Sequence, residues 1–406
     1  MKILVLNAGS SSQKSAFYDL AERQSDQPLQ PLWEAKIDWT HREGMAEIDV
    51  KTSRGKTHRE ELSARDRESA IAAMFNTLTS GETQVLEDLS EIEAVGHRVV
   101  HGGQEYRESV VITPEVKAAI ARLSTFAPAH NPANLEGIAA IEHRLGTVVP
   151  QVAVFDTAFH AQLPLPSAVY PIPYKWFEQG IRKYGFHGIS HEYCANRAAH
   201  LLNRALTELK LITCHLGNGC SLAAIQNGRS IDTTMGFTPL DGLMMGSRSG
   251  SIDPGILIHL MREEQYSVDD LDHLLNKNSG LKGVSGLSSD MRQIQAAIAN
   301  ENSSEAALAF EIYIHRLQAG IGAMMATLRG IDTLVFTAGV GENNAEVRSR
   351  TCEAFRFLGL KIDAEINENH PINQDIATPD STVRVLVIHT EEDWAIAQET
   401  QRICTV

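Results

Sequence analysis

Short apolar runs alternate with stretches of helical periodicity along most of the chain. This alternation predicts a layered α/β fold, because strands and helices must cover one another's apolar faces. The runs with the length and composition of strands are residues 3–6, 94–100, 152–155, 211–214, 334–337 and 383–388.

The clearest helical pattern covers residues 305–328, where Ser303 or Ser304 can cap the first turn. A second helix is predicted to follow Asn343 and to end near Gly359. Residues 22–56 are polar and poorly periodic, so we expect loops and edge strands there.

Two segments about two hundred residues apart repeat one pattern. KILVLNAGSSSQKSAFYDL and LKLITCHLGNGCSLAAIQNG each read as a strand, a turn of small polar residues and a second strand. Such turns expose backbone N–H groups and let a phosphate approach the main chain. The repeat predicts a duplicated fold with a cleft between two lobes, although two ordinary hairpins would give the same pattern.

Composition narrows the class of protein. A chain of 406 residues and 44.6 kDa is too long for one ordinary core, so we expect two domains. The net charge of −15 disfavours general binding to nucleic acid or to an anionic membrane. No apolar run reaches the roughly eighteen residues of a membrane span, and the N-terminal apolar run is too short for a signal peptide. The five cysteines lack CxxC spacing, so we expect a cytosolic protein with free thiols and without structural zinc.

The first hairpin turn contains candidate chemistry but no GxxxxGK[ST] motif. Lys14 can reach a phosphate, and Asn7 stands at a strand end, where a metal ion or its water can be held. A solvated hairpin tip with a surface lysine is the alternative.

Two arginines lie in settings unlike an ordinary surface. Arg98 belongs to the apolar run AVGHRVV, and Arg248 to the glycine- and serine-rich stretch MMGSRSGSIDPG. Burying a guanidinium without an anion is costly, and its planar fork suits carboxylate or phosphate. The pair favours an anionic substrate, with an internal salt bridge as the competing interpretation.

Asp156 closes the apolar run VAVF, the usual place for a catalytic or metal-associated carboxylate in an open α/β sheet. Its alternative role is to cap a following helix. In YGFHGISH, His187 and His191 have the i, i+4 spacing of a zinc pair, but Gly188 makes a helix through His187 doubtful and HExxH is absent. We therefore prefer a hydrogen-bond donor to a metal ligand.

The segment LVFTAGVGENNAEVR predicts a strand that runs into Gly339-Val340-Gly341, with a helix beginning near Glu342 and Asn343. A tight backbone approach at a helix N-terminus is typical of nucleotide contact. The GxG pattern alone is weak evidence for nucleotide binding, and the two hairpin turns of the phosphate-binding type strengthen it.

Together these motifs make the sequence resemble the acetokinase family, within the sugar kinase, Hsp70 and actin superfamily. The resemblance runs from end to end through NAGSSSQK, GHRVVHGG, APAHNPANLEGI, VFDTAFH, KYGFHGISH, HLGNGCS, TPLDGLMMGSRSG, GLSSDMR, FTAGVGEN and TEEDWAIA.

The resemblance implies a duplicated actin-like (ribonuclease H-like) fold with a nucleotide cleft between its lobes. The implied lobes are residues 1–157 with 393–406, and residues 158–392 for nucleotide binding. The implied activity is reversible phosphoryl transfer between ATP and acetate, giving ADP and acetyl phosphate. Mg²⁺ is the implied metal, which Mn²⁺ can replace, and the implied assembly is a homodimer.

Site roles follow from the same resemblance. Metal binding is implied for Asn7 and Glu392, and catalysis for Asp156, His187 and Arg248. The acid would be bound by Arg98 and by a small apolar pocket of Val100, Ala129, Phe186 and Pro239. The implied ATP contacts are Lys14, His215, Leu216, Gly217, Asn218, Gly219, Asp290, Met291, Arg292, Gly339, Val340, Gly341, Glu342 and Asn343.

The chain departs from the family pattern in three places. TEED stands where TNEE is usual, so which acidic residue of this segment is the metal ligand is left open. Near Arg248, Ser247 replaces a usual threonine and Ser251 replaces a usual acidic or amide residue. Ala129 stands where leucine is usual, which enlarges the implied pocket and suggests that propionate is tolerated. Propionate or butyrate kinase is the nearest alternative; an ATP switch like actin or Hsp70, and then a zinc hydrolase, are more distant.

Overall fold

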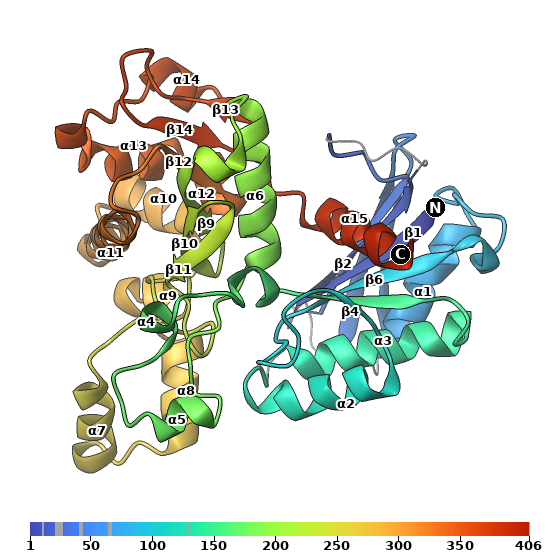
Figure 1. Cartoon of the computed structure of the whole chain (residues 1–406). Helices are drawn as coiled ribbons and strands as arrows, with labels where there is room; N and C mark the ends of the chain where they lie inside the picture. The colour runs from blue at the N-terminus through green and yellow to red at the C-terminus, as the bar shows by residue number, and fades with distance from the viewer. Residues whose placement is uncertain (10–11, 21–26, 40–43, 64–66, 129, 406) are drawn as a thin grey trace. The chain divides into compact units, whose positions relative to one another are not determined.

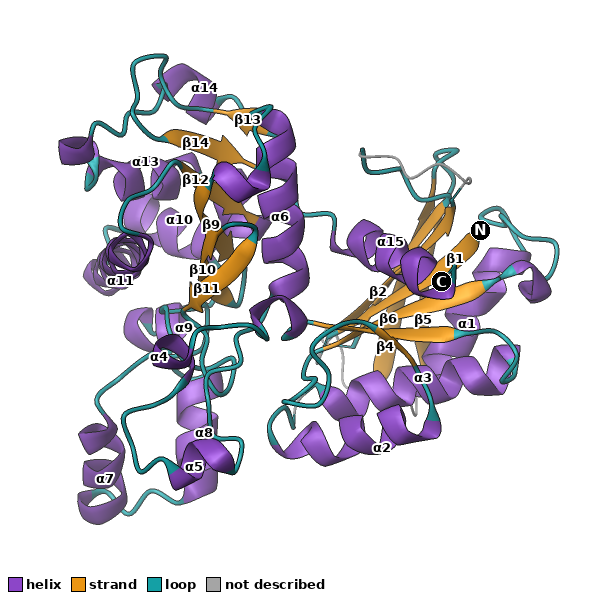
Figure 2. Cartoon of the chain, viewed as in Figure 1, coloured by secondary structure: helices purple, strands orange, loops and turns teal. Residues whose placement is uncertain are grey.

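The computed structural model describes residues 1–9, 12–20, 27–39, 44–63, 67–128 and 130–405. The chain divides into two compact units: Met1–Ala158 with Glu391–Val406, and Phe159–Thr390. In each unit a sheet is covered by helices (Figure 2), as the alternating pattern predicts. Ser10 and Ser11 of the first turn and Ala129 of the implied pocket lie outside the described residues.

The first unit is built on an eight-stranded sheet with the order β5-β4-β3-β2-β1-β6-β8-β7. β1 pairs in parallel with β6, and β6 with β8, whereas the remaining pairs are antiparallel. The strands are β1 (Lys2–Ala8), β2 (Ser12–Asp19), β3 (Trp33–Asp38), β4 (Met45–Thr52), β5 (Thr57–Ser63), β6 (Ala94–Val99), β7 (Val110–Val111) and β8 (Gln151–Phe155).

Helices cover both faces of this sheet. In Figure 1 the central strands lie between α15 and the pair α1 and α3. Their apolar side chains form the core: Leu4, Phe17 and Trp33 of the sheet are buried against Met74 and Phe75 of α1. The helices are α1 (Arg67–Thr79), α2 (Pro114–Arg122), α3 (Asn131–Leu145) and α15 (Glu392–Cys404).

The second unit carries a six-stranded sheet with the order β11-β10-β9-β12-β14-β13. Figure 1 shows its strands between α6 and α11. The strands are β9 (Lys210–Leu216), β10 (Cys220–Gln226), β11 (Arg229–Thr233), β12 (Thr333–Thr337), β13 (Gln374–Asp375) and β14 (Arg384–Val387). The helices are α4 (Leu165–Ala168), α5 (Lys175–Glu178), α6 (Gly188–Leu201), α7 (Pro254–Glu263), α8 (Val268–Lys277), α9 (Gly280–Ser285), α10 (Met291–Glu301), α11 (Ser304–Leu328), α12 (Ala338–Asn343), α13 (Ala345–Glu353) and α14 (Ala364–Glu368).

The two sheets repeat one topology. The order β3-β2-β1-β6-β8-β7 in the first unit matches β11-β10-β9-β12-β14-β13 in the second, and corresponding neighbours run in the same relative directions. Each of the two predicted hairpins supplies the first two strands of its sheet in chain order. The predicted duplication of the fold is therefore confirmed, and β4 and β5 extend the first copy.

The prediction of edge strands over residues 22–56 is wrong in part. β3 and β4 lie inside the sheet, and the strand at the edge next to them is β5. Trp33, Ile37 and Ile48 are buried, but charged residues on the opposite face separate them in sequence. That alternation is the period-two signature of a half-buried strand.

The six predicted strands form, and so does the helix over residues 305–328, which is α11 with Ser303 as its N-cap. Near Asn343 the prediction needs correction. A helix, α12, already begins at Ala338 and contains the glycines, while α13 follows from an Asn344 cap and a 3₁₀ turn ends at Gly359. Glycines disfavour a helix, so the sequence pattern predicted a turn here. The helix is stabilised because the Glu342 carboxylate accepts a hydrogen bond from the Ala338 N–H at 2.8 Å, which satisfies a backbone donor of its first turn. Within the described ranges, no helix combines the length and apolar character needed to cross a membrane.

Acid should destabilise both units because each buries a neutral histidine. Burial lowers the pKa of His97 and of His160 to about 4, so the unfolded chain binds more protons between pH 6.5 and 4. Their contribution to stability is complete above pH 6.5 and falls by about 2 kcal/mol for each ring by pH 5. We expect thermal unfolding midpoints to drop over that range, and to drop less in His97→Gln. His143→Gln, which replaces an exposed histidine, controls for the substitution itself.

Candidate active site

In both units the predicted site residues gather at the carboxyl ends of the central parallel strands. In the first unit Asn7 is near the end of β1, Arg98 near the end of β6, and Asp156 directly after β8. In the second, the 217–219 turn follows β9 and α12 follows β12. Ligand sites of open α/β sheets form at these ends.

A charged cluster joins these residues in the first unit. The Arg98 guanidinium donates from Nη2 and Nε to Asp156 Oδ2 at 2.5 and 3.0 Å, and from Nη1 to Asn7 Oδ1 at 3.2 Å. The Asn7 amide nitrogen donates to Glu392 Oε2 at 3.2 Å and to Asp393 Oδ1 at 3.0 Å. The internal salt bridge considered for Arg98 is thus present, and its partner is the predicted catalytic carboxylate.

The cluster carries more negative than positive charge. Burial alone would lower the pKa of Arg98, but the Asp156 and Glu392 carboxylates raise it. Burial raises the pKa of Asp393, and the neighbouring Glu392 raises it further. Crowded carboxylates of this kind are stabilised by a cation.

The oxygen donors of Glu392 and Asp393 suit Mg²⁺, which binds carboxylates and keeps several waters. Among the described residues there is no group of three or more histidine, cysteine or acidic side chains placed to hold a metal ion. Mg²⁺ commonly takes only one or two carboxylates and completes its shell with substrate phosphates and water, so the donor set fits it. Both ends of the Asn7 amide already have protein partners.

Two further predicted residues lie in the first unit. Lys14 is exposed on β2, and its charge acts on Asp393. Val100 is buried, and its N–H donates to Asn134 Oδ1 at 3.1 Å.

Predicted residues of the second unit converge on the β9–β10 turn. A Cβ atom at Gly219 would lie 3.5 Å from both His187 Nε2 and Arg248 Nη1. A Cβ atom at Gly217 would lie 3.7 Å from His215 Nε2 and 3.8 Å from the Ala338 Cβ atom. The backbone of the glycine turn therefore lies beside His187, Arg248 and His215, where a phosphate could approach the main chain closely.

Arg248 differs from Arg98 in lacking a carboxylate. Its half-buried guanidinium donates from Nη1 to the Pro239 carbonyl oxygen at 2.8 Å and approaches Met245 Sδ at 3.7 Å. No described acidic residue forms a salt bridge with it, and burial lowers its pKa. A desolvated guanidinium with neutral partners is a strong site for an anion.

Two non-glycine residues beside the turn adopt left-handed backbone angles. His187 has φ 57° as the N-cap of α6, and Ala338 has φ 63° at the start of α12. Such conformations are strained and concentrate at functional sites. A helix through His187 does not form, as Gly188 indicated, because α6 begins at Gly188.

The remaining predicted ATP contacts surround the same turn. The Gly246 N–H donates to the Asn218 carbonyl oxygen at 3.2 Å, and a Cβ atom at Gly246 would lie 2.9 Å from the Ser289 carbonyl oxygen. That contact brings the segment of Asp290, Met291 and Arg292 beside the turn. Asp290 caps α10 and pairs with Arg292 at 2.6 Å.

Leu216 and Phe186 of the second unit are buried. Glu342 binds His389 Nδ1 at 2.6 Å, and Asn343 Nδ2 donates to the Gly339 carbonyl oxygen at 2.9 Å. Arg348 donates to the carbonyl oxygens of Gly341 and Glu342 at 3.0 and 2.8 Å, which stabilises the end of α12. The structure thus gathers the predicted residues of each unit, and their ligand contacts stay predictions.

Sequence reasoning missed several side chains that hold this site. The Asn7 amide donates to both Asp393 and Glu392. The acidic side chain of Asp393 in the TEED motif was the signal that could have identified it. Ser190 and Ser221 bind His215 and His187, but nothing in their sequence setting distinguishes them from other serines.

A repeated six-stranded topology with a small-residue hairpin turn opening each copy defines the duplicated actin-like class of two-domain proteins. Within that class the chain belongs to the acetokinase family, whose model matches residues 2–398.

Individual relatives agree with this assignment. The chain is 65% identical to an acetate kinase of Cyanothece sp. over 399 residues, 98% of this chain and 97% of that protein. It is 64% identical to an acetate kinase of Gloeobacter violaceus over 400 residues, 98% of each. Among solved structures, Porphyromonas gingivalis acetate kinase matches with a TM-score of 0.90 at 39% identity, and a propionate kinase of Francisella tularensis with 0.89 at 38%, each covering 99% of both chains.

Proposed function

We propose that the protein is an acetate kinase, which transfers the γ-phosphoryl group of ATP reversibly to acetate and gives acetyl phosphate and ADP. The observation that carries this is Arg248, a half-buried guanidinium without a described carboxylate, beside Gly219 and His187. Membership of the acetokinase family and relatives named acetate kinase at 59% to 65% identity support it.

The chemistry needs no general base, because a carboxylic acid is already ionised at neutral pH. What slows it is repulsion between the carboxylate and the charged phosphates. Arg98, Arg248 and Lys14 would supply the neutralising charge and hold the reactants for direct in-line attack. No covalent enzyme intermediate is required.

Asp156 would act through Arg98. Its two hydrogen bonds to the guanidinium support a role in fixing the plane of that group against the acid. An additional negative charge would otherwise oppose the approach of phosphate. Val100, Phe186, Pro239 and Ala129 would line the pocket for the acid's methyl group.

Mg²⁺, or Mn²⁺ in its place, would neutralise charge on the phosphates when bound. Glu392 and Asp393 would hold it directly or through water, and Asn7 would orient both carboxylates. Their first-turn position in α15 favours negative side chains through the helix dipole.

The nucleotide would lie on the second unit. His215, Leu216, Gly217, Asn218 and Gly219 would cradle its phosphates, with His187 donating to the phosphoryl group during transfer. Asp290, Met291 and Arg292, together with Gly339, Val340, Gly341, Glu342 and Asn343, would contact the nucleoside side.

The test is acid-dependent formation of ADP with MgATP, with the acyl phosphate trapped by hydroxylamine. We expect acetate to give acyl hydroxamate and ADP in equal amounts, and little ADP without acid. ADP formed at the same rate without any acid would instead indicate an ATP switch and would refute the proposal.

Propionate kinase is the second candidate, supported by the propionate kinase of Francisella tularensis among the similar structures. Ala129 in place of the leucine usual in the family is the sequence feature that favours it. One methylene in an apolar pocket is worth about 1–3 kcal/mol, so discrimination would be partial. We expect Ala129→Leu to raise the acetate-to-propionate ratio of kcat/KM by roughly tenfold or more; an unchanged ratio would show that residue 129 does not set specificity.

We also propose that the protein is a homodimer. Ile256, Ile258 and Met261 of α7 are exposed, and no residue of that helix is buried, which is unusual for an apolar helix and supports coverage by a second copy. Light scattering at micromolar concentration should give twice the chain mass of 44.6 kDa. The mass of one chain would contradict the dimer.

A further inference from the structure

Four histidines of the second unit share one arrangement. Each has its Nδ1 atom within hydrogen-bond distance of a serine or threonine hydroxyl. The pairs are His160 with Ser230 at 2.7 Å, His187 with Ser221 at 2.8 Å, His191 with Thr213 at 2.7 Å and His215 with Ser190 at 2.8 Å. Because a hydroxyl can donate or accept, the positions of the ring protons depend on what lies behind each hydroxyl.

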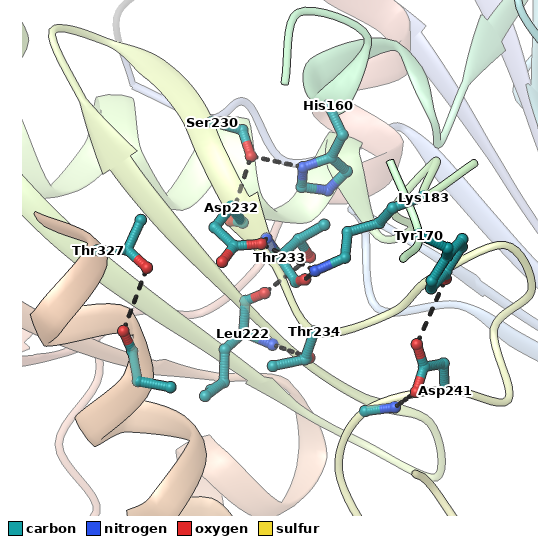
Figure 3. Close-up of polar contacts among 12 residues, drawn as sticks. His160, Tyr170, Lys183, Leu222, Ser230, Asp232, Thr233, Thr234, Asp241 and Thr327 are labelled. Carbon is teal, nitrogen blue, oxygen red and sulfur yellow. Dashed lines mark hydrogen bonds and ion pairs between the residues drawn. The ribbon is translucent and has the colours of Figure 1, made fainter. Parts of the chain in front are cut away.

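One direction is fixed without ambiguity. His160 Nε2 lies 3.1 Å from the Phe186 carbonyl oxygen, which can only accept. The pKa of His160 is lowered to about 4 by burial, so the neutral ring carries its proton on Nε2 and must accept at Nδ1. The Ser230 hydroxyl therefore donates to His160 Nδ1 at 2.7 Å and leaves the Asp232 carbonyl oxygen, 3.5 Å away, as the weaker contact (Figure 3).

The second chain runs from Thr213 to His187. Ser221 Oγ lies 2.8 Å from both His187 Nδ1 and His191 Nε2, and His191 Nδ1 lies 2.7 Å from Thr213 Oγ1. His191, Thr213 and Ser221 are fully buried. Burial, with His160 and His215 nearby, lowers the pKa of His191 well below its usual value, so this ring has one N–H to give.

The direction of this chain follows from Thr213. Among the described residues its hydroxyl has one hydrogen-bond partner, His191 Nδ1. If Thr213 donates to His191, then His191 Nε2–H donates to Ser221, and the Ser221 hydroxyl donates to His187 Nδ1. Every buried hydrogen then has an acceptor. The reverse direction leaves the Thr213 hydrogen buried without one, which disfavours it by roughly tenfold to a hundredfold.

A shorter chain directs His215 in the same way. Thr390 Oγ1 donates to Ser190 Oγ at 3.0 Å, and Ser190 Oγ lies 2.8 Å from His215 Nδ1. Since Ser190 already accepts from Thr390, its own hydrogen is available to His215. His215, like His187, then carries its proton on Nε2.

Both rings point these Nε2 atoms at the glycine turn. Their centroids are 4.1 Å apart with an angle of 19° between the planes, a stacked contact that two imidazolium cations would oppose. His187 Nε2 lies 3.5 Å from a Cβ atom built at Gly219, and His215 Nε2 3.7 Å from one built at Gly217. The Nε2 atoms of both rings therefore lie beside the backbone of the turn.

We propose that these two hydroxyl relays, Thr213–His191–Ser221 and Thr390–Ser190, hold the stacked rings of His187 and His215 neutral, with a proton on each Nε2. The site thereby presents two neutral N–H donors to the phosphoryl oxygens. Thr213, His191 and Ser221 are positioning residues, because they act through His187. The kinetic consequence rests on the proposed kinase activity, whereas the tautomer does not.

The tautomer can be read directly from the two-bond ¹H–¹⁵N spectrum of the full chain labelled with ¹⁵N-histidine. His187→Gln assigns the signals of residue 187. We expect the neutral Nε2–H form of His187 at pH 7. An imidazolium, or the Nδ1–H form, would overturn the proposal whatever the enzyme's activity.

Thr213 offers a matched pair of variants outside the ligand site. Thr213→Val keeps the shape and loses the hydroxyl, whereas Thr213→Ser keeps the hydroxyl and loses a methyl group. We expect Thr213→Val to mix the two tautomers of His187 and to lower kcat roughly two- to tenfold with little change in KM for ATP. Thr213→Ser should retain the tautomer and kcat.

The pair separates a relay from simple packing. A packing role would reduce activity in Thr213→Ser as much as in Thr213→Val, and would leave the His187 tautomer unchanged in both; either result overturns the relay. Wild-type protein that forms no acyl phosphate would refute the kinase activity instead, and the spectrum of His187 would still decide the tautomer.

Discussion

Arg248→Gln should lower kcat by about two to three orders of magnitude. The guanidinium is half-buried, donates to the Pro239 carbonyl oxygen and has no acidic partner among the described residues. Its charge is therefore available to the transferring phosphoryl group. Removing one well-placed donor from developing charge costs about 2.7–4 kcal/mol of transition-state stabilisation. Initial rates at saturating ATP and acetate measure the effect.

The fold should tolerate this change, because no described carboxylate relies on Arg248. Glutamine can still donate to the Pro239 carbonyl oxygen, so thermal unfolding should shift little. Arg204→Gln is the matched control, because this exposed arginine of the same unit also donates to a carbonyl oxygen, that of Glu208, and it should retain kcat. A rate within threefold of wild type in Arg248→Gln would remove Arg248 from the reaction.

Asp156→Asn should lower kcat by about a hundredfold, with a smaller change in KM for Mg²⁺. The carboxylate binds Arg98 through two hydrogen bonds, at 2.5 and 3.0 Å, and its side chain is almost fully buried. Asparagine keeps the shape and one acceptor but loses the charge, so the guanidinium is held less firmly. Misplacing a positioning group commonly costs about a hundredfold in rate.

A second paired carboxylate separates this effect from the loss of any ion pair. Glu142 binds Lys117 at 2.6 Å, also in the first unit, and Glu142→Gln should leave kcat unchanged because half-exposed pairs contribute about 0–1 kcal/mol. Full kcat in Asp156→Asn at saturating Mg²⁺ would show that Asp156 does not position Arg98.

Local patterns predicted much of the fold. The two hairpins follow from apolar runs broken by small polar residues, and the Ser303 cap of α11 from its side chain. β3 and β4 were predicted as edge strands because exposed charged residues alternate with their buried positions, as Asp49 does beside Ile48. Which strands are central depends on long-range pairing, such as that of β1 with β6, and a local pattern does not contain it.

Residue types allowed individual site residues to be predicted, but not the contacts between them. Arg98 and Asp156 were each singled out, but their mutual salt bridge depends on the neighbouring strands β6 and β8. The Thr213–His191–Ser221 chain joins residues of β9, α6 and β10. Threonine and serine are ordinary in strands, so only the fold reveals that these hydroxyls direct histidines.

Direct transfer between two anions is the central claim, and the stereochemistry at phosphorus tests it most directly. ATP made chiral at the γ-phosphorus with oxygen isotopes would be converted with acetate, and the configuration of the acetyl phosphate determined. A single in-line attack predicts inversion. Retention would require a phosphorylated enzyme as an intermediate and would contradict direct transfer.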